Sequence, residues 1–139
     1  MPIRQVQITL SAKPRGFHLV SDEILSQLPL LKQAKVGMLE LFLKHSSASL
    51  SINENADPSV RSDMENFFTE LCDDKAYYQH TYEGADDMPA HIKSSIIGPS
   101  LSIPITDGAL NLGVWQGVYL NEHRDHASAR HIVATLIYE

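Results

Sequence analysis

The segment from Tyr78 to His91 gathers more ionisable side chains than packing requires. It reads YQHTYEGADDMPAH, with two histidines and three carboxylates around a turn at Gly84. Histidine is the usual metal ligand and proton carrier near neutral pH, and carboxylates supply hard ligands or bases. We therefore expect a functional site here, in which the glycine turn lets these groups converge.

Asp87 and His91 are four residues apart in a stretch that we expect to be a helix, from Met88 to Ile97. Side chains at that spacing share one face of a helix, so both can touch a common ion or each other. Glu83 can approach the same point from the turn. Because aspartate often begins helices, Asp86 and Asp87 have a second interpretation as residues that merely start this one.

A divalent metal ion is the cofactor that these residues suggest. His45 lies at the end of an expected strand, and a site formed by His45, His80 and His91 would have chemically sensible ligands. Neither zinc-finger spacing nor an HExxH helix occurs, so the choice between Mg²⁺ and Zn²⁺ stays open. A single histidine at a strand end is more often structural, which is the alternative for His45.

Hydroxyl groups follow His45 in the sequence HSSAS. Ser46 and Ser47, together with backbone N–H groups, could hold an anion such as phosphate. The alternative interpretation is an ordinary polar turn. No G-x-S-x-G motif is present, so the sequence does not indicate a serine nucleophile.

A third candidate segment runs from Gly113 to Arg124. Glycines on both sides of Trp115 and Gln116 would let a ligand or a backbone come close to a strand, and the indole could stack on a planar ring. Arg124 can fork onto a phosphate or a carboxylate, and Glu122 can orient it or bind a metal. The alternatives are a core or interface anchor for Trp115 and a surface ion pair for Arg124.

The spacing of apolar residues predicts the elements that must position these groups. We expect about six strands, near residues 6–10, 36–43, 50–52, 101–105, 110–120 and 132–138. We expect about three helices, near 24–31, 58–71 and 88–97, of which the second starts at Asp57 and buries a stripe from Val60 to Leu71. Residues 13–16 read as a turn, 78–82 as an extended piece and 121–128 as a polar loop. Strands joined by turns favour antiparallel pairing, which predicts the α+β class.

Composition restricts the classes of protein to consider. The 139 residues, 43% of them hydrophobic, predict one domain spanning residues 1–139. The net charge of -6 argues against nucleic acid or an anionic membrane as a partner. With no apolar run long enough for a membrane span or a signal peptide, we expect a cytoplasmic protein. The single cysteine, Cys72, lies among apolar residues, which indicates a packed thiol.

Three stretches together are similar to the YjbQ family. They are HSSASLSINENADP at 45–58, HTYEGADDMPAH at 80–91 and LGVWQGVYLNEHR at 112–124. The likeness covers almost the whole chain, and its one departure is Ser46, where the family usually has threonine, so a hydroxyl group is retained. The resemblance implies a compact α+β fold that assembles as a homotrimer, with a polar pocket that holds a metal or an anion.

The resemblance also implies an activity, that of a secondary thiamine-phosphate synthase. Such an enzyme joins hydroxymethylpyrimidine diphosphate to a thiazole phosphate and releases diphosphate, so its substrates are small and phosphorylated. The expected catalytic residues are Glu83, Asp87, Trp115, Gln116 and Glu122; the phosphate ligands are Ser46, Ser47, Asn53, Asn55 and Arg124; and the metal ligands are His45, His80 and His91. Two alternatives stay open: a non-enzymatic protein that binds a metal or a phosphorylated metabolite, and a metal-assisted phosphoester hydrolase.

Overall fold

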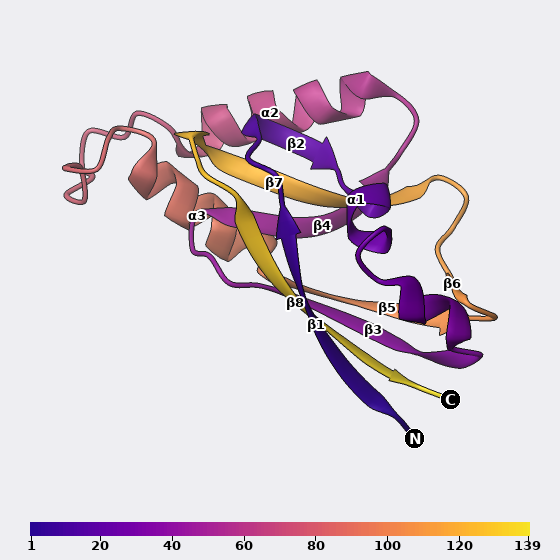
Figure 1. Ribbon diagram of the computed structural model, residues 1–139. Helices are drawn as coiled ribbons and strands as arrows, with labels where there is room; N and C mark the ends of the chain where they lie inside the picture. The colour runs from indigo at the N-terminus through magenta and orange to yellow at the C-terminus, as the bar shows by residue number, and fades with distance from the viewer.

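The computed structural model describes all 139 residues and contains eight strands in two antiparallel sheets (Figure 1). The larger sheet has the order β1 (Ile3–Leu10), β8 (Arg130–Tyr138), β3 (Val36–Leu43), β5 (Ser100–Thr106) and β6 (Ala109–Leu110). The smaller sheet has the order β2 (Pro14–Leu19), β7 (Gln116–His126) and β4 (Ala48–Glu54). The two sheets enclose the main hydrophobic core, and the predicted α+β class is confirmed.

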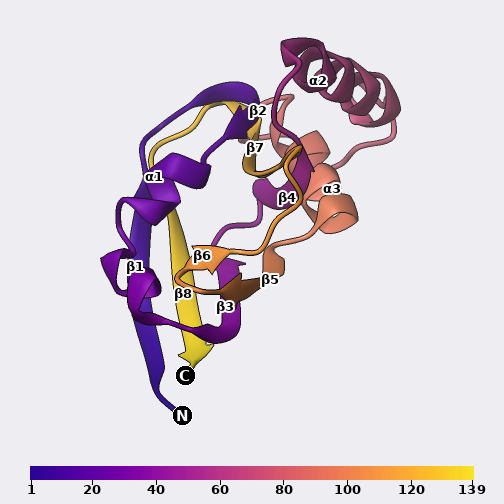
Figure 2. The same cartoon turned by 90° about the vertical axis from the view of Figure 1, so that its right-hand side faces the viewer.

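Helices complete the architecture. The long helices α2 (Pro58–Cys72) and α3 (Asp87–Ile97) lie against the smaller sheet, and a second view shows them on the side away from the larger one (Figure 2). A short helix α1 (Ser21–Leu25) and a 3₁₀ turn η1 (Pro29–Gln33) close one end between the sheets. None of the helices has the length and apolar composition needed to span a lipid bilayer.

Strand β7 is the element around which the smaller sheet is built, because β2 and β4 pair with its two edges. Successive side chains of a strand point to opposite faces. Val118 and Leu120 therefore belong to the main core between the sheets, whereas Tyr119 packs with Phe17 and Phe68 beneath the helices. Both faces of β7 are covered, so every residue from Gly117 to His123 is buried.

Two segments predicted to lack regular structure are strands. Residues 14–16 belong to β2, whose register against β7 shifts between Pro14 and Gly16. The glycine and proline therefore mark a bulge within a strand, which the sequence pattern could not distinguish from a turn. The predicted polar loop at 121–128 is wrong for its first six residues, because β7 continues to His126 and buries Asn121, Glu122 and His123. The expected extended piece at 78–82 forms no strand.

Helix α2 begins as predicted but buries a different stripe. The Asp57 side chain accepts a hydrogen bond from the Ser59 N–H and caps the helix. The buried residues are Phe68 and Cys72, while Phe67 is 59% exposed. Cys72 is a free, buried thiol, as predicted, and burial raises its pKa.

Candidate metal centre

Two imidazole rings and one carboxylate converge where α3 begins. Nε2 of His80 lies 2.7 Å from Oδ2 of Asp87, and Nε2 of His91 lies 3.2 Å from the same oxygen. All three ligand atoms lie within 4.8 Å of one another. The Asp87 side chain is 1% exposed, whereas those of His80 and His91 are 38% and 30% exposed, so the cluster opens to solvent on its histidine side.

The local sequence explains why these groups meet. Asp87 is the first residue of α3 and His91 follows one turn later, so they share a face of the helix. His80 returns to that face because the chain turns at Gly84, whose φ of 112° lies in the region that glycine adopts without strain. The predicted helix and the predicted glycine turn are confirmed.

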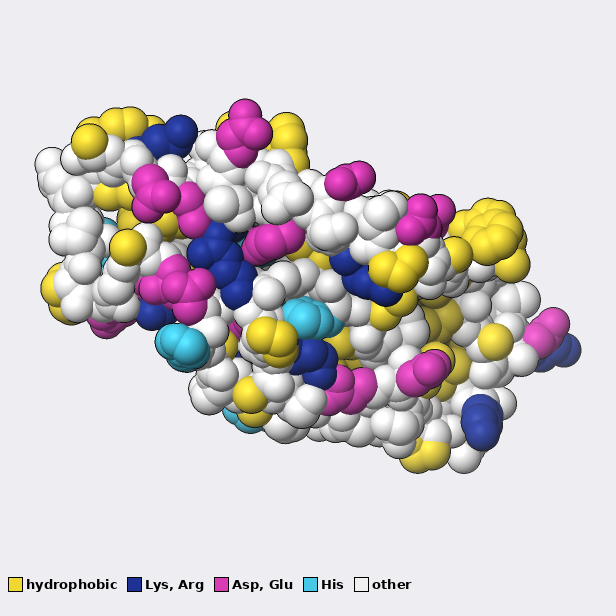
Figure 3. All heavy atoms as spheres, turned by 90° about the horizontal axis from the view of Figure 1, so that it is seen from above, with side chains coloured by type: hydrophobic (Ala, Val, Ile, Leu, Met, Phe, Trp, Pro, Cys, Tyr) yellow, Lys and Arg dark blue, Asp and Glu magenta, His cyan; other side chains and the backbone are white.

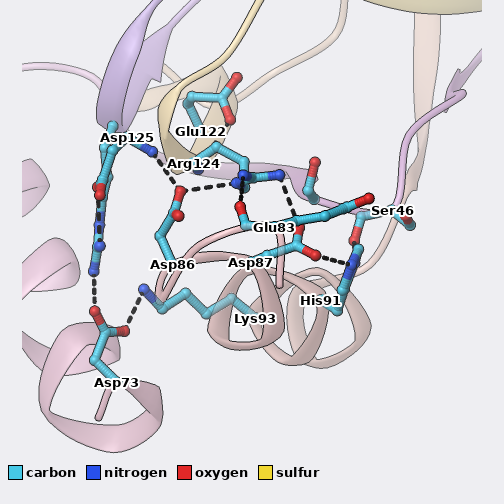
Figure 4. A network of polar contacts seen from close by, with 12 residues as sticks. Ser46, Asp73, Glu83, Asp86, Asp87, His91, Lys93, Glu122, Arg124 and Asp125 are labelled. Atoms are coloured by element: carbon cyan, nitrogen blue, oxygen red, sulfur yellow. Dashed lines mark hydrogen bonds and ion pairs between the residues drawn. The ribbon is translucent and has the colours of Figure 1, made fainter. Parts of the chain in front are cut away.

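In His91 and Asp87, the polar atom that faces away from the cluster is held by a distant part of the chain (Figure 4). Nδ1 of His91 donates to the carbonyl oxygen of Ser46 at 2.8 Å, and Oδ1 of Asp87 accepts from Nη1 of Arg124 at 2.8 Å. A carbonyl oxygen only accepts, so in the neutral ring the proton of His91 is on Nδ1 and the lone pair of Nε2 faces Asp87. Ligands steered in this way by outer partners are typical of metal sites, and the donor set fits a divalent cation.

Arg124 was predicted to hold phosphate, but the structure engages its guanidinium within the chain. Nε binds Oδ2 of Asp86 at 2.8 Å, Nη1 binds Asp87, and Nη2 donates to the carbonyl oxygen of Glu83 at 3.0 Å. The hydrogen bond to Asp86 is the main reason that the pKa of Arg124 is raised. Arg124 therefore fastens the turn and the first residue of α3 to the end of β7.

Asp86 is not a simple helix cap, which was its alternative interpretation. It occupies the N-cap position of α3 without a capping hydrogen bond, and its Oδ2 accepts instead from Arg124 and from the Asp125 N–H at 2.9 Å. Burial acts to raise the pKa of both carboxyl groups, but hydrogen bonds outweigh it. The pKa of Asp86 is lowered by bonds from the Asp125 N–H and Arg124, and that of Asp87 by the bond from His80. Both carboxylates are therefore ionised at neutral pH.

His45 is not part of the cluster, contrary to the expected set of three histidines. Its Nε2 accepts a hydrogen bond from the backbone N–H of His131 at 2.8 Å, and the two rings stack with centroids 5.7 Å apart. Burial and the charge of Arg130 lower the pKa of His45, which keeps the ring neutral as this bond requires. The place expected for His45 is taken by Asp87.

The loop after His45 touches the cluster through its backbone. The Ser46 carbonyl holds His91, and the Ser47 carbonyl accepts from Nη2 of Arg130 at 3.2 Å. Ser46 is exposed beside His91, and in Figure 4 the Glu83 side chain extends over Asp87 in its direction. Of the expected site residues, Ser46, Glu83 and Arg124 therefore lie with His80, Asp87 and His91.

Glu122 lies inside the protein and is paired with Arg130, a residue that the sequence did not single out. Nε of Arg130 binds Oε1 of Glu122 at 2.7 Å, and a second nitrogen binds Oε2. Glu122 is fully buried and Arg130 is 6% exposed. Glu122 was expected to bind a metal or to orient the Arg124 side chain, and within the chain it does neither. It does not contact the cluster, and its only bond to Arg124 is from the backbone N–H at 3.2 Å.

The remaining expected site residues lie at the other end of β7. Asn55 donates to the carbonyl oxygens of Val114 and Gln116, and Oε1 of Gln116 accepts from the Gly113 N–H at 2.7 Å. These bonds fix the loop that carries Trp115, which is 64% exposed and not a core residue. Asn53 is exposed on the neighbouring end of β4. Within one chain, this group is separated from the cluster of His80, Asp87 and His91 by the length of the strand.

A second charged network lies behind the cluster and was missed because its members are far apart in sequence. Arg15 binds Asp73 at 2.6 Å, Glu65 at 3.3 Å and Asp125 at 3.3 Å, and the fully buried Lys93 lies 2.9 Å from Oδ1 of Asp73. Seen from the side of α2, basic side chains lie beside acidic ones (Figure 3). These pairs join β2, α2, α3 and β7, and thereby position the start of α3.

His123 makes the stability of the fold depend on pH. Its Nε2 lies 2.8 Å from Oγ of Ser49, and burial with the charges of Lys93 and Arg130 lowers its pKa from 6.5 to about 3. Below pH 6.5 His123 binds a proton in the unfolded chain but not in the folded protein, so the free energy of unfolding decreases as the pH falls toward 3.

We expect His123→Gln to reduce the change of the free energy of unfolding with pH by up to about 1.4 kcal/mol per pH unit in this range. Urea unfolding of the wild type and the variant at several pH values measures this change. If the free energy of unfolding depended on pH equally in both proteins, the prediction would be contradicted.

Comparison with known proteins agrees with the motifs and the fold. The model of the family described as UPF0047 protein YjbQ-like matches residues 6–139. The chain belongs to this family. It is 56% identical over 132 residues to UPF0047 protein YjbQ of Escherichia coli O157:H7, which covers 95% of this chain and 96% of that protein. A relative from Salmonella typhimurium, with the same coverage, is 57% identical over 132 residues.

Solved structures of family members share the architecture. A YjbQ/UPF0047 protein from Clostridium acetobutylicum is 31% identical and superposes with a TM-score of 0.83 over 95% of this chain and 99% of that one. A protein from Sulfolobus solfataricus, 21% identical, has a TM-score of 0.85 over 99% of both chains and shows the likeness of fold alone. The family resemblance predicted from the three motifs is thus confirmed.

Proposed function

We propose that this family member is a metal-dependent transferase that joins hydroxymethylpyrimidine diphosphate to a thiazole phosphate. The observation that supports the proposal best is the convergence of two imidazole nitrogens and one carboxylate oxygen within 4.8 Å at an open surface. Two nitrogens and one oxygen suit Zn²⁺ better than Mg²⁺, which is usually held by carboxylates, phosphates and water. Three protein ligands also leave room for a substrate oxygen.

The proposed reaction breaks the bond between a benzylic-type carbon and the diphosphate oxygen, and forms a bond from that carbon to the thiazole. Diphosphate leaves with the electron pair of the broken bond. A divalent ion held by His80, Asp87 and His91 would supply the positive charge that favours this departure.

The residues of the chain have separate parts in this proposal. His80, Asp87 and His91 bind the ion, and Arg124 holds Asp87 in place from behind. The exposed hydroxyl group of Ser46 can donate to a phosphate oxygen, because only the carbonyl of that residue is occupied. Glu83 lies at the open side, where its carboxylate can orient a substrate donor.

The proposal includes assembly as a cytoplasmic homotrimer, which the family resemblance implies. Trp115, Gln116, Asn53 and Asn55 lie at the end of β7 away from the cluster. A head-to-tail ring can bring one end of a subunit against the opposite end of its neighbour, so these residues would then face the metal ligands. The molar mass in solution decides this part of the proposal.

The decisive experiment is a product assay with zinc-loaded protein. We expect diphosphate release only when the pyrimidine and thiazole substrates are both present, and at least about a hundredfold loss of the rate in His80→Ala and His91→Ala. His126→Ala is the matched control, because His126 is exposed at the end of β7 outside the cluster. Circular dichroism checks that all variants are folded.

Each other outcome identifies a different function. Diphosphate release from one substrate alone would indicate a phosphoester hydrolase. Zinc binding that depends on His80 and His91 without any turnover would indicate a binding protein. Wild-type turnover in a folded His80→Ala/His91→Ala protein would refute the assignment of the site.

A further inference from the structure

A groove of about 380 Å³ lies at the opposite end of β7 from the metal cluster. It runs between α1 with η1 on one side and the β6 region on the other, which lie together in Figure 1 and are joined by the bond from the Gly108 N–H to the Ala34 carbonyl. Its apolar lining consists of Leu25, Leu28, Leu31, Ala109, Leu110 and Leu112. The volume is at the lower end of the range of small-molecule sites.

One end of the groove is polar and fixed in place. Ser21, Asn55 and Gln116 line it. Oγ of Ser21 accepts from the Val118 N–H at 2.9 Å, and the amide groups of Asn55 and Gln116 are tied to the Trp115 loop. This end is therefore preorganised, and the side-chain Oδ1 of Asn55 and Nε2 of Gln116 are left to bind a ligand.

The two ends differ in charge. Lys32, in the last turn of η1, is exposed on the groove and forms none of the ion pairs of the chain. At the other end, Ser21 and Asn55 also border a second hollow of about 250 Å³ that contains Asp22 and Glu23. Because Glu23 is paired with Lys13, Asp22 is the unpaired carboxylate near that end, and a negatively charged group is favoured at the Lys32 end.

We propose that this groove binds a small amphipathic anion, with an apolar body between the leucine walls and a carboxylate at Lys32. The leucine walls supply affinity through the apolar surface that the ligand removes from water, and the lysine supplies selectivity for the anion. The groove shares no residue with the metal cluster, although its polar end includes Asn55 and Gln116, which the proposed trimer would place against a neighbouring subunit. The proposal is therefore tested at Lys32 and Ala109, which have no part in the proposed transferase site.

Calorimetric titration with octanoate, and with 1-octanol as its uncharged counterpart, tests the proposal. We expect sub-millimolar binding of octanoate to the wild type, about tenfold weaker binding to Lys32→Met, and unchanged binding to Lys35→Met, a matched exposed lysine outside the groove. In Lys32→Met the preference for octanoate over octanol should disappear. Ala109→Trp, which fills the groove from an exposed strand position, should prevent binding of both ligands.

Circular dichroism of the same variants shows that each is folded. The proposal is overturned if octanoate does not bind the wild type below about 5 mM. It is also overturned if Lys32→Met and Lys35→Met bind octanoate equally, or if Ala109→Trp binds it like the wild type. Equal binding by the two lysine variants would show that the carboxylate does not lie at Lys32. Unchanged binding by Ala109→Trp would show that the apolar body does not lie in the groove.

Discussion

Asp87→Asn is expected to weaken zinc binding by at least about a hundredfold while the protein stays folded. The carboxylate is the only anionic ligand of the cluster, and Oδ2 lies 2.7 Å and 3.2 Å from the two histidine nitrogens. Asparagine has the same shape, so the buried site loses charge without gaining a cavity. Arg124 keeps its bonds to Asp86 and to the Glu83 carbonyl, which hold the turn in place.

Competition with a chromogenic chelator measures the zinc affinity of this variant. Asp86→Asn is the matched control, because Asp86 precedes Asp87 and also binds Arg124 but does not belong to the cluster. Its expected effect is about tenfold or less, the lower limit for an outer partner. Equal losses in the two variants would mean that Asp87 acts through the arginine and not as a ligand.

Arg130→Met is expected to lower the free energy of unfolding by about 3–5 kcal/mol. Glu122 is fully buried and its two carboxylate oxygens both accept from Arg130, so removal of the arginine leaves a buried charge without its partner. The hydrogen bond from the Arg130 side chain to the Ser47 carbonyl is lost as well.

Urea unfolding of the single and double variants separates the two causes of this loss. If the unpaired charge dominates, Arg130→Met/Glu122→Leu should recover most of the stability, because a buried pair can be replaced by apolar groups at little cost. Arg4→Met, in an exposed arginine of β1, should change stability by less than about 0.5 kcal/mol. A double variant as unstable as Arg130→Met would contradict this explanation.

The sequence predicted the parts of the site that depend on local geometry. Asp87 and His91 share a helix face and Gly84 reverses the chain, and both features follow from spacing and residue type alone. The cluster spans twelve residues from His80 to His91, so no long-range information was needed to propose it. The replacement of His45 by Asp87 required knowledge of the tertiary structure, because the His131 N–H that occupies His45 is 86 residues away.

The errors have a common physical origin in polar residues that are buried. The hydrophilic residues Asn121, Glu122 and His123 predict a loop at 121–128. Residues 121–126 instead continue β7, since each of these three side chains has a partner inside the protein. Polarity indicates exposure only when no partner is present, and the partners here, Ser49 and Arg130, come from other strands. Trp115 is a different case, because the sequence left open whether it stacks on a ligand or anchors the core or an interface, and its 64% exposure excludes only the core.

The bond from Arg124 to Asp87 has a consequence for the metal site that we propose, because it couples the binding of an ion there to folding. The three ligands lie close together in sequence, so the unfolded chain also carries them, but Arg124 and Ser46 reach the cluster only after β7 and the loop before β4 are in place. An ion that binds this geometry more tightly than the unfolded chain stabilises the folded state by a free energy that grows with the logarithm of the ratio of the two affinities. The affinity for zinc would then report the integrity of the whole smaller sheet, although every ligand comes from one short segment.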